Sequence, residues 1–240
     1  VSLGLLVVSI DAGTLKGHVK YDGKAPKKKK LRMDADPVCG SSHSSPVLSE
    51  NFKMASDGSM AEALVYLKNV KYNGGVPSEP AVLDQKGCIY VPHVFGMVAG
   101  QELLIKNSDA TLHNIHSMPK VNKEFNFAMP KVVKEKKATF SKSEPDPFYI
   151  KCDVHPWMKT WVLVSDHPYF AVTDAKGNFS LSRVSSSTQI GYNYTSTAKT
   201  LPITFQLGNS LVSGEKIRKM FAELQFFKSY VRRRIKGDEP

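Results

Sequence analysis

The chain has 240 residues, of which 41% are apolar, enough to bury a substantial core. Its 16 Gly, its 14 Pro and its many short runs of Val, Ile, Phe and Tyr favour an all-β fold over a helical one. The formal net charge of +11 favours an anionic partner, such as an acidic protein or a lipid surface. No basic stretch in the middle part of the chain shows a recognisable nucleic-acid-binding motif, so nucleic acid is not an expected partner.

The first residues, Val1–Ile10, are apolar but too few to span a bilayer. We interpret residues 1–12 as the remnant of a secretory signal, with cleavage after Ala12. A buried first strand is the alternative interpretation. The signal interpretation predicts a periplasmic or otherwise exported protein.

Residues 13–60 are expected to form β elements ahead of the main domain. Leu15, Val19 and Tyr21 alternate with polar residues and predict a strand that ends in a turn. Residues 63–67 are apolar throughout, which is typical of a strand buried on both faces.

Further strands are predicted along the middle of the chain, at residues 87–91, 102–106, 112–115, 138–141, 148–151 and 160–164. The last of these is apolar on both faces. Such a strand is covered on both sides in a folded protein. We therefore expect additional N-terminal or C-terminal chain to pack over the outside of the sheet that contains it.

One loop between two predicted strands carries three potential metal ligands. Cys152, His155 and Met158 lie within seven positions, and a tight loop can turn all three donor atoms toward one point. A second segment, residues 107–114, supplies His113. Two imidazoles, one thiolate and a weak thioether form the donor set of a blue-copper electron-transfer site.

These two motifs, in this order and about a domain's length apart, resemble the cupredoxin family, in particular its amicyanin-like and plastocyanin-like members. The resemblance implies a Greek-key β-sandwich over residues 61–168. It also implies one type 1 copper site, with His113, Cys152 and His155 in a trigonal plane and Met158 as a long axial ligand. Residues 126–130 are rich in aromatic and apolar side chains and are expected beside the site.

Roles are also expected for neighbours of the ligands. Asn114 is expected to tie the first ligand segment to the backbone near Asp153. The resemblance implies that the edge of His155 lies at the surface, where Pro156 and Trp157 would form an apolar docking patch. An ordinary core aromatic is the alternative interpretation of Trp157.

If Cys152 binds copper, Cys39 and Cys88 remain. In an exported protein a disulfide is the simplest expectation for such a pair. Two alternatives remain open. The cysteines are either free thiols or, with His43 and His93, ligands of a second metal such as zinc.

The C-terminal extension, residues 169–240, begins with a predicted strand-turn-strand that resembles the segment after the copper domain in larger exported cupredoxin-like proteins. Residues 216–236 have apolar side chains at helical spacing and include three consecutive arginines. Three interpretations remain open. The segment is a basic amphipathic helix in peripheral contact with a membrane or a partner, a helix packed on the sandwich, or a tail translated in a shifted reading frame.

The donor set predicts a type 1 copper electron-transfer protein that cycles between Cu(II) and Cu(I) and exchanges electrons with a redox protein, acidic given the positive charge of this chain. We see no nucleophile–base pair, no repeated His-x-His pair and no second thiolate on the loop, so we do not expect an enzyme. The alternative is a copper storage or delivery protein, or a noncatalytic subunit of a redox complex.

Overall fold

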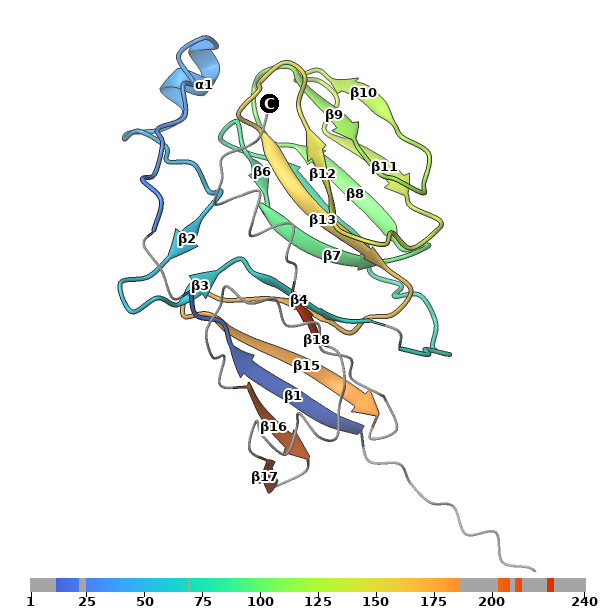
Figure 1. Ribbon diagram of the computed structural model, residues 1–240. Coiled ribbons are helices and arrows are strands. Elements are labelled where there is room, and N and C mark those ends of the chain that lie inside the picture. The colour runs from blue at the N-terminus through green and yellow to red at the C-terminus, as the bar shows by residue number, and fades with distance from the viewer. Residues whose placement is uncertain are drawn as a thin grey trace, which may run out of the picture.

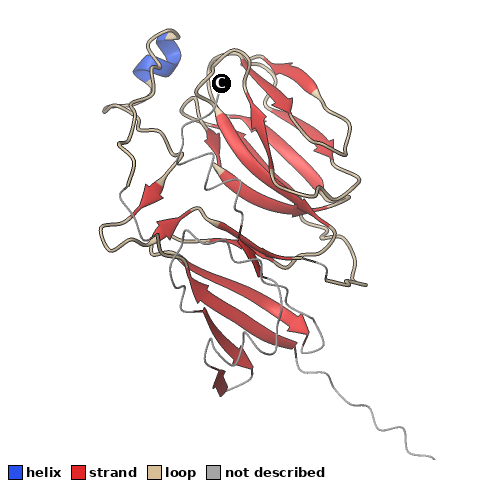
Figure 2. Cartoon of the chain, viewed as in Figure 1, coloured by secondary structure: helices blue, strands red, loops and turns tan. Residues whose placement is uncertain are grey.

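The computed structural model describes residues 12–21, 25–68 and 70–185, and three short strands at 203–207, 210–212 and 224–226. In this part of the chain almost all regular structure is β-strand, and the only helix is the short α1 (Pro37–Ser41) (Figures 1 and 2). The all-β sandwich predicted from the sequence is confirmed. Among the described residues, no helix is long and apolar enough to cross a membrane.

Two sheets pack face to face in the upper part of the molecule (Figure 1). The first has the order β10-β9-β12-β13-β7, and its strands are β10 (Asn126–Met129), β9 (His113–Ser117), β12 (Phe148–Lys151), β13 (Lys159–Ser165) and β7 (Val94–Val98). The second has the order β11-β8-β5-β6, and its strands are β11 (Glu135–Thr139), β8 (Glu102–Asn107), β5 (Ala81–Gln85) and β6 (Tyr90–Val91). The pairs β13–β7 and β5–β8 are parallel, and the other pairs are antiparallel.

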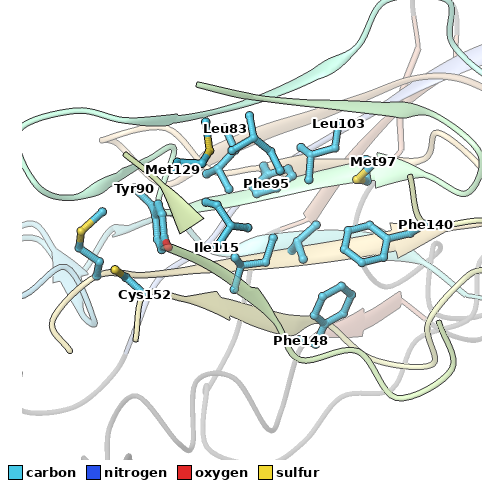
Figure 3. Close-up of a cluster of buried hydrophobic side chains, with 14 of the residues drawn as sticks. Leu83, Tyr90, Phe95, Met97, Leu103, Ile115, Met129, Phe140, Phe148 and Cys152 are labelled. Carbon is cyan, nitrogen blue, oxygen red and sulfur yellow. The ribbon is translucent and has the colours of Figure 1, made fainter. Parts of the chain in front are cut away.

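The main hydrophobic core lies between these two sheets (Figure 3). Leu83 and Leu103 come from the second sheet, and Ile115 comes from the first. Their side chains are fully buried because alternate residues of each strand point inward. Cys152 lies at one end of this core, beside Tyr90 (Figure 3). The candidate metal ligands therefore lie at the end of a densely packed sandwich.

A third layer covers the outside of the first sheet. It is the sheet β14-β4-β18, whose strands are β14 (Phe170–Val172), β4 (Leu64–Leu67) and β18 (Leu224–Phe226). Trp161 and Leu163 on the outer face of β13 pack against Leu64 and Tyr66 of β4. The expected cover over this strand is confirmed.

The opposite face of β4 packs on a second, smaller core. Val65 and Leu67 join Leu15 and Leu181 in this cluster, so β4 is buried on both faces, as its apolar sequence predicts. Strands β1 (Ala12–His18), β3 (Met60–Ala61) and β15 (Asn178–Ser185) contribute side chains to this core, and β2 (Lys53–Met54) packs against it. Strands β16 (Ile203–Leu207) and β17 (Ser210–Val212) extend the sheet that contains β1 and β15.

The N-terminal and C-terminal extensions pair with each other. Strand β1 lies between β15 and β16, antiparallel to both. Strand β4, expected as the start of the copper domain, instead pairs with β14 and β18 from the C-terminal part. The boundaries at residues 60/61 and 168/169 stay predictions, and the strands on either side of them form shared sheets.

Two predictions concern segments that are largely outside the described residues. The signal interpretation falls on residues 1–12, of which only Ala12, the first residue of β1, is described. The helical interpretation of residues 216–236 is wrong for Leu224–Phe226, which form strand β18. The reason is that β18 pairs with an edge of β4 that would otherwise leave backbone groups without a partner.

Candidate metal centre

The loop between β12 and β13 places three of the predicted ligands. Cys152 follows β12 directly, and Met158 immediately precedes β13. The Cys152 N–H donates to the Met158 carbonyl at 3.1 Å, and the Met158 N–H donates to the His155 carbonyl at 2.9 Å. These bonds close the loop on itself and hold the three residues at one end of the sandwich.

The fourth predicted ligand, His113, is the first residue of β9, which pairs with β12. The donor atoms of His113, Cys152 and His155 all lie within 4.8 Å of one another. Nδ1 of His113 is 3.0 Å from Nδ1 of His155, and the Cys152 Sγ is 3.8 Å from that same His155 nitrogen. Met158 is buried in the same cluster as Cys152.

All four side chains are shielded from solvent, with exposed fractions of 0% for His113, 2% for Cys152, 2% for His155 and 1% for Met158. A buried thiol and two imidazoles with converging donor atoms, near a buried thioether, fit the preferences of copper. Harder ions that prefer carboxylate and carbonyl oxygen fit this donor set poorly.

Each imidazole is held by a carboxylate through its other ring nitrogen. His113 Nε2 is 2.8 Å from Asp109 Oδ2, and His155 Nε2 is 3.1 Å from Asp36 Oδ2. Carboxylates in this position fix the tautomer and the orientation of a ligating histidine. Nδ1 is therefore the nitrogen that each ring offers to the shared centre.

The surroundings shift the pKa values of the two imidazoles in opposite directions. Burial acts to lower the pKa of His113, but hydrogen bonds to Asp109 and Cys152 outweigh it and raise this pKa to about 9. Burial lowers the pKa of His155, opposed by its hydrogen bond to Asp36. These opposite shifts favour His113 over His155 as the donor of the proton in the hydrogen bond between the two Nδ1 atoms. A metal at these nitrogens must displace that proton.

Asn114 links the two ligand-bearing segments. Its Oδ1 accepts a hydrogen bond from the Asp153 N–H at 2.9 Å, and its Nδ2 donates to Asn126 Oδ1 at 2.6 Å. The first bond is the link to the backbone near Asp153 that was expected from the sequence. Strand β10, which contains Asn126, pairs with β9 beside the site.

The expectation that the edge of His155 reaches the surface is wrong. The side chain is buried because Asp36 and Cys39 cover its outer edge, and Cys39 Sγ is 3.7 Å from its Nε2. Of the two expected docking residues, Pro156 is exposed and Trp157 is half-buried. The Trp157 ring lies 5.0 Å from the His155 ring, so it connects this imidazole to the surface.

Cys39 and Cys88 form a disulfide in the structure. The alternative zinc site has no geometric support among the described residues. His43 Nε2 bonds to the Gly87 carbonyl, and neither His43 nor His93 belongs to a cluster of candidate metal ligands.

Three residues at the site were not predicted from the sequence. Asp109 lies four positions before His113, and this short spacing could have indicated that the two side chains interact. Asp36 lies 119 positions from its partner His155, and no local pattern indicates that contact. Tyr90 lies next to Cys152 (Figure 3). Burial, followed by the charge of Cys152, raises the pKa of Tyr90 well above its ordinary value.

Comparisons with known proteins identify similar solved structures but no family. No protein-family model matches the chain, and no curated protein matches it. The purple cupredoxin from Nitrosopumilus maritimus is 22% identical, with a TM-score of 0.30, over 35% of this chain and 99% of that protein. A Cu-containing nitrite reductase from Thermus scotoductus SA-01 is 20% identical, with a TM-score of 0.32, over 41% of this chain and 25% of the reductase.

A mutant of amicyanin in its Cu(I) form is 20% identical, with a TM-score of 0.32, over 43% of this chain and 99% of amicyanin. Each of these alignments covers less than half of the chain. The ligand assignment therefore depends on the side chains described above.

Proposed function

We propose that this protein is a type 1 copper electron-transfer protein whose ligands are His113, Cys152, His155 and Met158. The main support is the buried convergence of a thiol and two imidazoles within 4.8 Å, of which Cys152 and His155 lie on a loop that also buries the Met158 thioether. Copper bound there would supply one-electron chemistry by cycling between Cu(II) and Cu(I).

The rigidity of the ligand segments supports this proposal. The 152–158 loop is closed by its own backbone hydrogen bonds, and Asn114 ties it to β9. Ligands that are already fixed need little rearrangement when the metal changes oxidation state. The burial of the site favours retention of copper over transfer to another protein, which weighs against the alternative of a storage or delivery protein.

An electron would leave the site through Trp157. This side chain contacts the His155 ring and is partly exposed, while Pro156 and the 47% exposed Val154 lie beside it on the same loop. These three residues define the proposed docking patch. Lys134 lies close to the site, with Nζ 3.5 Å from the Asp109 carbonyl. Together with the net charge of +11, it favours an acidic redox protein as the partner.

We propose an exported location, because a disulfide is stable in an oxidising compartment and rare in the cytosol. A peripheral membrane contact through the basic C-terminal stretch also stays a proposal, since most of that stretch lies outside the described residues. We propose that the protein carries electrons without transforming a substrate.

Voltammetry of the copper-loaded protein tests the proposal. A reversible one-electron couple is expected in the wild type and in Val132→Ala, a control variant at a 77% exposed side chain outside both the ligand loop and the docking patch. Cys152→Ser should lose this couple because it removes the thiolate. Tight Cu(I) binding without any reversible couple would instead favour the storage or delivery alternative.

A further inference from the structure

The outer side of the metal centre contains a closed set of contacts that begins at His155. Its Nε2 lies 3.1 Å from Asp36 Oδ2. The other carboxylate oxygen of Asp36 accepts hydrogen bonds from the N–H groups of Val38 at 2.8 Å and Cys39 at 3.3 Å, because Asp36 is the N-cap of α1. One imidazole is thus connected, through a carboxylate, to the backbone of Cys39.

The other imidazole is connected in the same way to Cys88. His113 Nε2 lies 2.8 Å from Asp109 Oδ2. This carboxylate accepts from the N–H groups of Gly87 at 2.7 Å and Cys88 at 2.8 Å. Gly87 and Cys88 have φ values of +67° and +55°, and this left-handed turn directs both N–H groups at one carboxylate. A left-handed conformation is uncommon for a residue with a side chain, so the strain at Cys88 needs a compensating contact.

The Cys39–Cys88 disulfide closes the ring, because it joins the two residues whose N–H groups hold the two carboxylates. Thr111 adds a cross-link, since its hydroxyl donates to Asp36 Oδ2 at 2.9 Å. Both carboxylates are partly buried, which strengthens their hydrogen bonds relative to the same bonds in water.

We infer that Asp36 and Asp109 are positioning residues of the metal centre, and that the Cys39–Cys88 disulfide couples them into one frame. This frame directs Nε2 of each imidazole at a carboxylate and turns Nδ1 toward the metal. The inference rests on the proposed copper function only for its effect on the metal. The arrangement of the imidazoles is a property of the chain itself.

The two halves of the frame differ in how they are anchored. Asp109 belongs to the loop between β8 and β9, so the sandwich holds it independently of the disulfide. Asp36 belongs to the N-terminal extension, and the disulfide attaches its helix to the sandwich. Loss of the disulfide should therefore release His155 and leave His113 in place. Two electrons and two protons convert the disulfide to two thiols, so a dithiol reductant would have the same effect.

Long-range ¹H–¹⁵N NMR spectra of the metal-free protein test the frame directly. In the wild type, His155 should carry its proton on Nε2, which faces Asp36. Asp36→Asn keeps a good N-cap for α1 but replaces the carboxylate, so His155 should become a mixture of tautomers. The double variant Cys39→Ser/Cys88→Ser should show the same change at His155, with His113 unaltered. Asp34→Asn is the matched control, an exposed aspartate on the same segment, and should change neither ring.

Copper affinity, measured by competition with a chelator, is the second readout. Asp36→Asn and Asp109→Asn should each weaken binding by roughly 10- to 100-fold, the usual effect of removing a partner of a metal ligand. Asp34→Asn should leave the affinity unchanged. If the double serine variant does not fold, the two aspartate variants still decide the question.

The outcomes separate the two proposals. The inference is overturned if His155 carries its proton on Nδ1 in the wild type. It is equally overturned if both aspartate variants keep wild-type tautomers and copper affinity. A wild type with the expected tautomers that binds no copper would overturn the proposed function and support the positioning frame.

Discussion

Nδ1 of His113 lies 3.0 Å from Nδ1 of His155, although 42 positions separate the two residues. This distance allows one hydrogen bond between the two nitrogens, and the raised pKa of His113 favours it as the donor. The same two atoms, with the Cys152 sulfur, are the donors that a copper ion needs. The proton and the metal therefore compete for one place, and copper binding must release a proton.

The contribution of Met158 differs from that of the two histidines. A thioether binds copper weakly and tunes the potential more than it holds the metal. Met158→Gln should therefore keep copper but lower the reduction potential, because a harder oxygen donor favours Cu(II). His113→Ala should be more damaging, because it removes a close ligand. Voltammetry of both variants checks this, and an unchanged or raised potential in Met158→Gln would show that Met158 is not a ligand.

The outer layer should stabilise the sandwich without affecting the metal centre. Leu163 lies on the outer face of β13, is 2% exposed and packs against β4. Leu163→Ala should lower the free energy of unfolding by about 2–5 kcal/mol, measured with urea. Val132→Ala is the control, since Val132 is 77% exposed and its loss should change little. Equal midpoints for the two variants would mean that this layer does not contribute to stability.

Glu144 should make stability depend on acid pH. Burial acts to raise its pKa, but hydrogen bonds from Asn122 and from the Lys120 and Val121 N–H groups outweigh burial and hold the pKa below 4.5. A depressed folded-state pKa means that the charged form stabilises the protein above the unfolded-state pKa. That contribution is lost as the pH falls through the folded-state value.

The matching variant is Glu144→Gln, which cannot ionise. At pH 7 the free energy of unfolding of this variant should be lower than that of the wild type by about 1–3 kcal/mol, because the substitution weakens charge-assisted hydrogen bonds. The difference from the wild type should shrink as the pH falls below 4.5. Urea titrations at several pH values measure it. A difference that stays constant down to pH 2 would contradict the assignment.

The sandwich and the ligand loop could be predicted because their signals are local. Alternation and apolar runs indicated the strands, and the doubly apolar β13 indicated a covering layer. Short loop spacing brought Cys152, His155 and Met158 together. The pairing of β1 with β15 could not be predicted, because no local pattern identifies partners at opposite ends of a chain.

The outer side of the site could not be predicted for the same reason. Asp36 reaches His155 only because the N-terminal extension folds across the end of the sandwich and is joined there through Cys39 and Cys88. The family resemblance implied an exposed imidazole edge, and the extension covers it. The fold of the extension, rather than the motif, determines how much of His155 meets solvent.

The central claim is that the thiolate of Cys152 binds copper together with His113 and His155. Titration of the metal-free protein with Cu(II), followed by visible absorption, tests it most directly. We expect an intense thiolate-to-copper band that saturates at one equivalent in the wild type and is absent in Cys152→Ser. A wild type that develops no such band, or a Cys152→Ser variant that keeps it, would contradict the assignment.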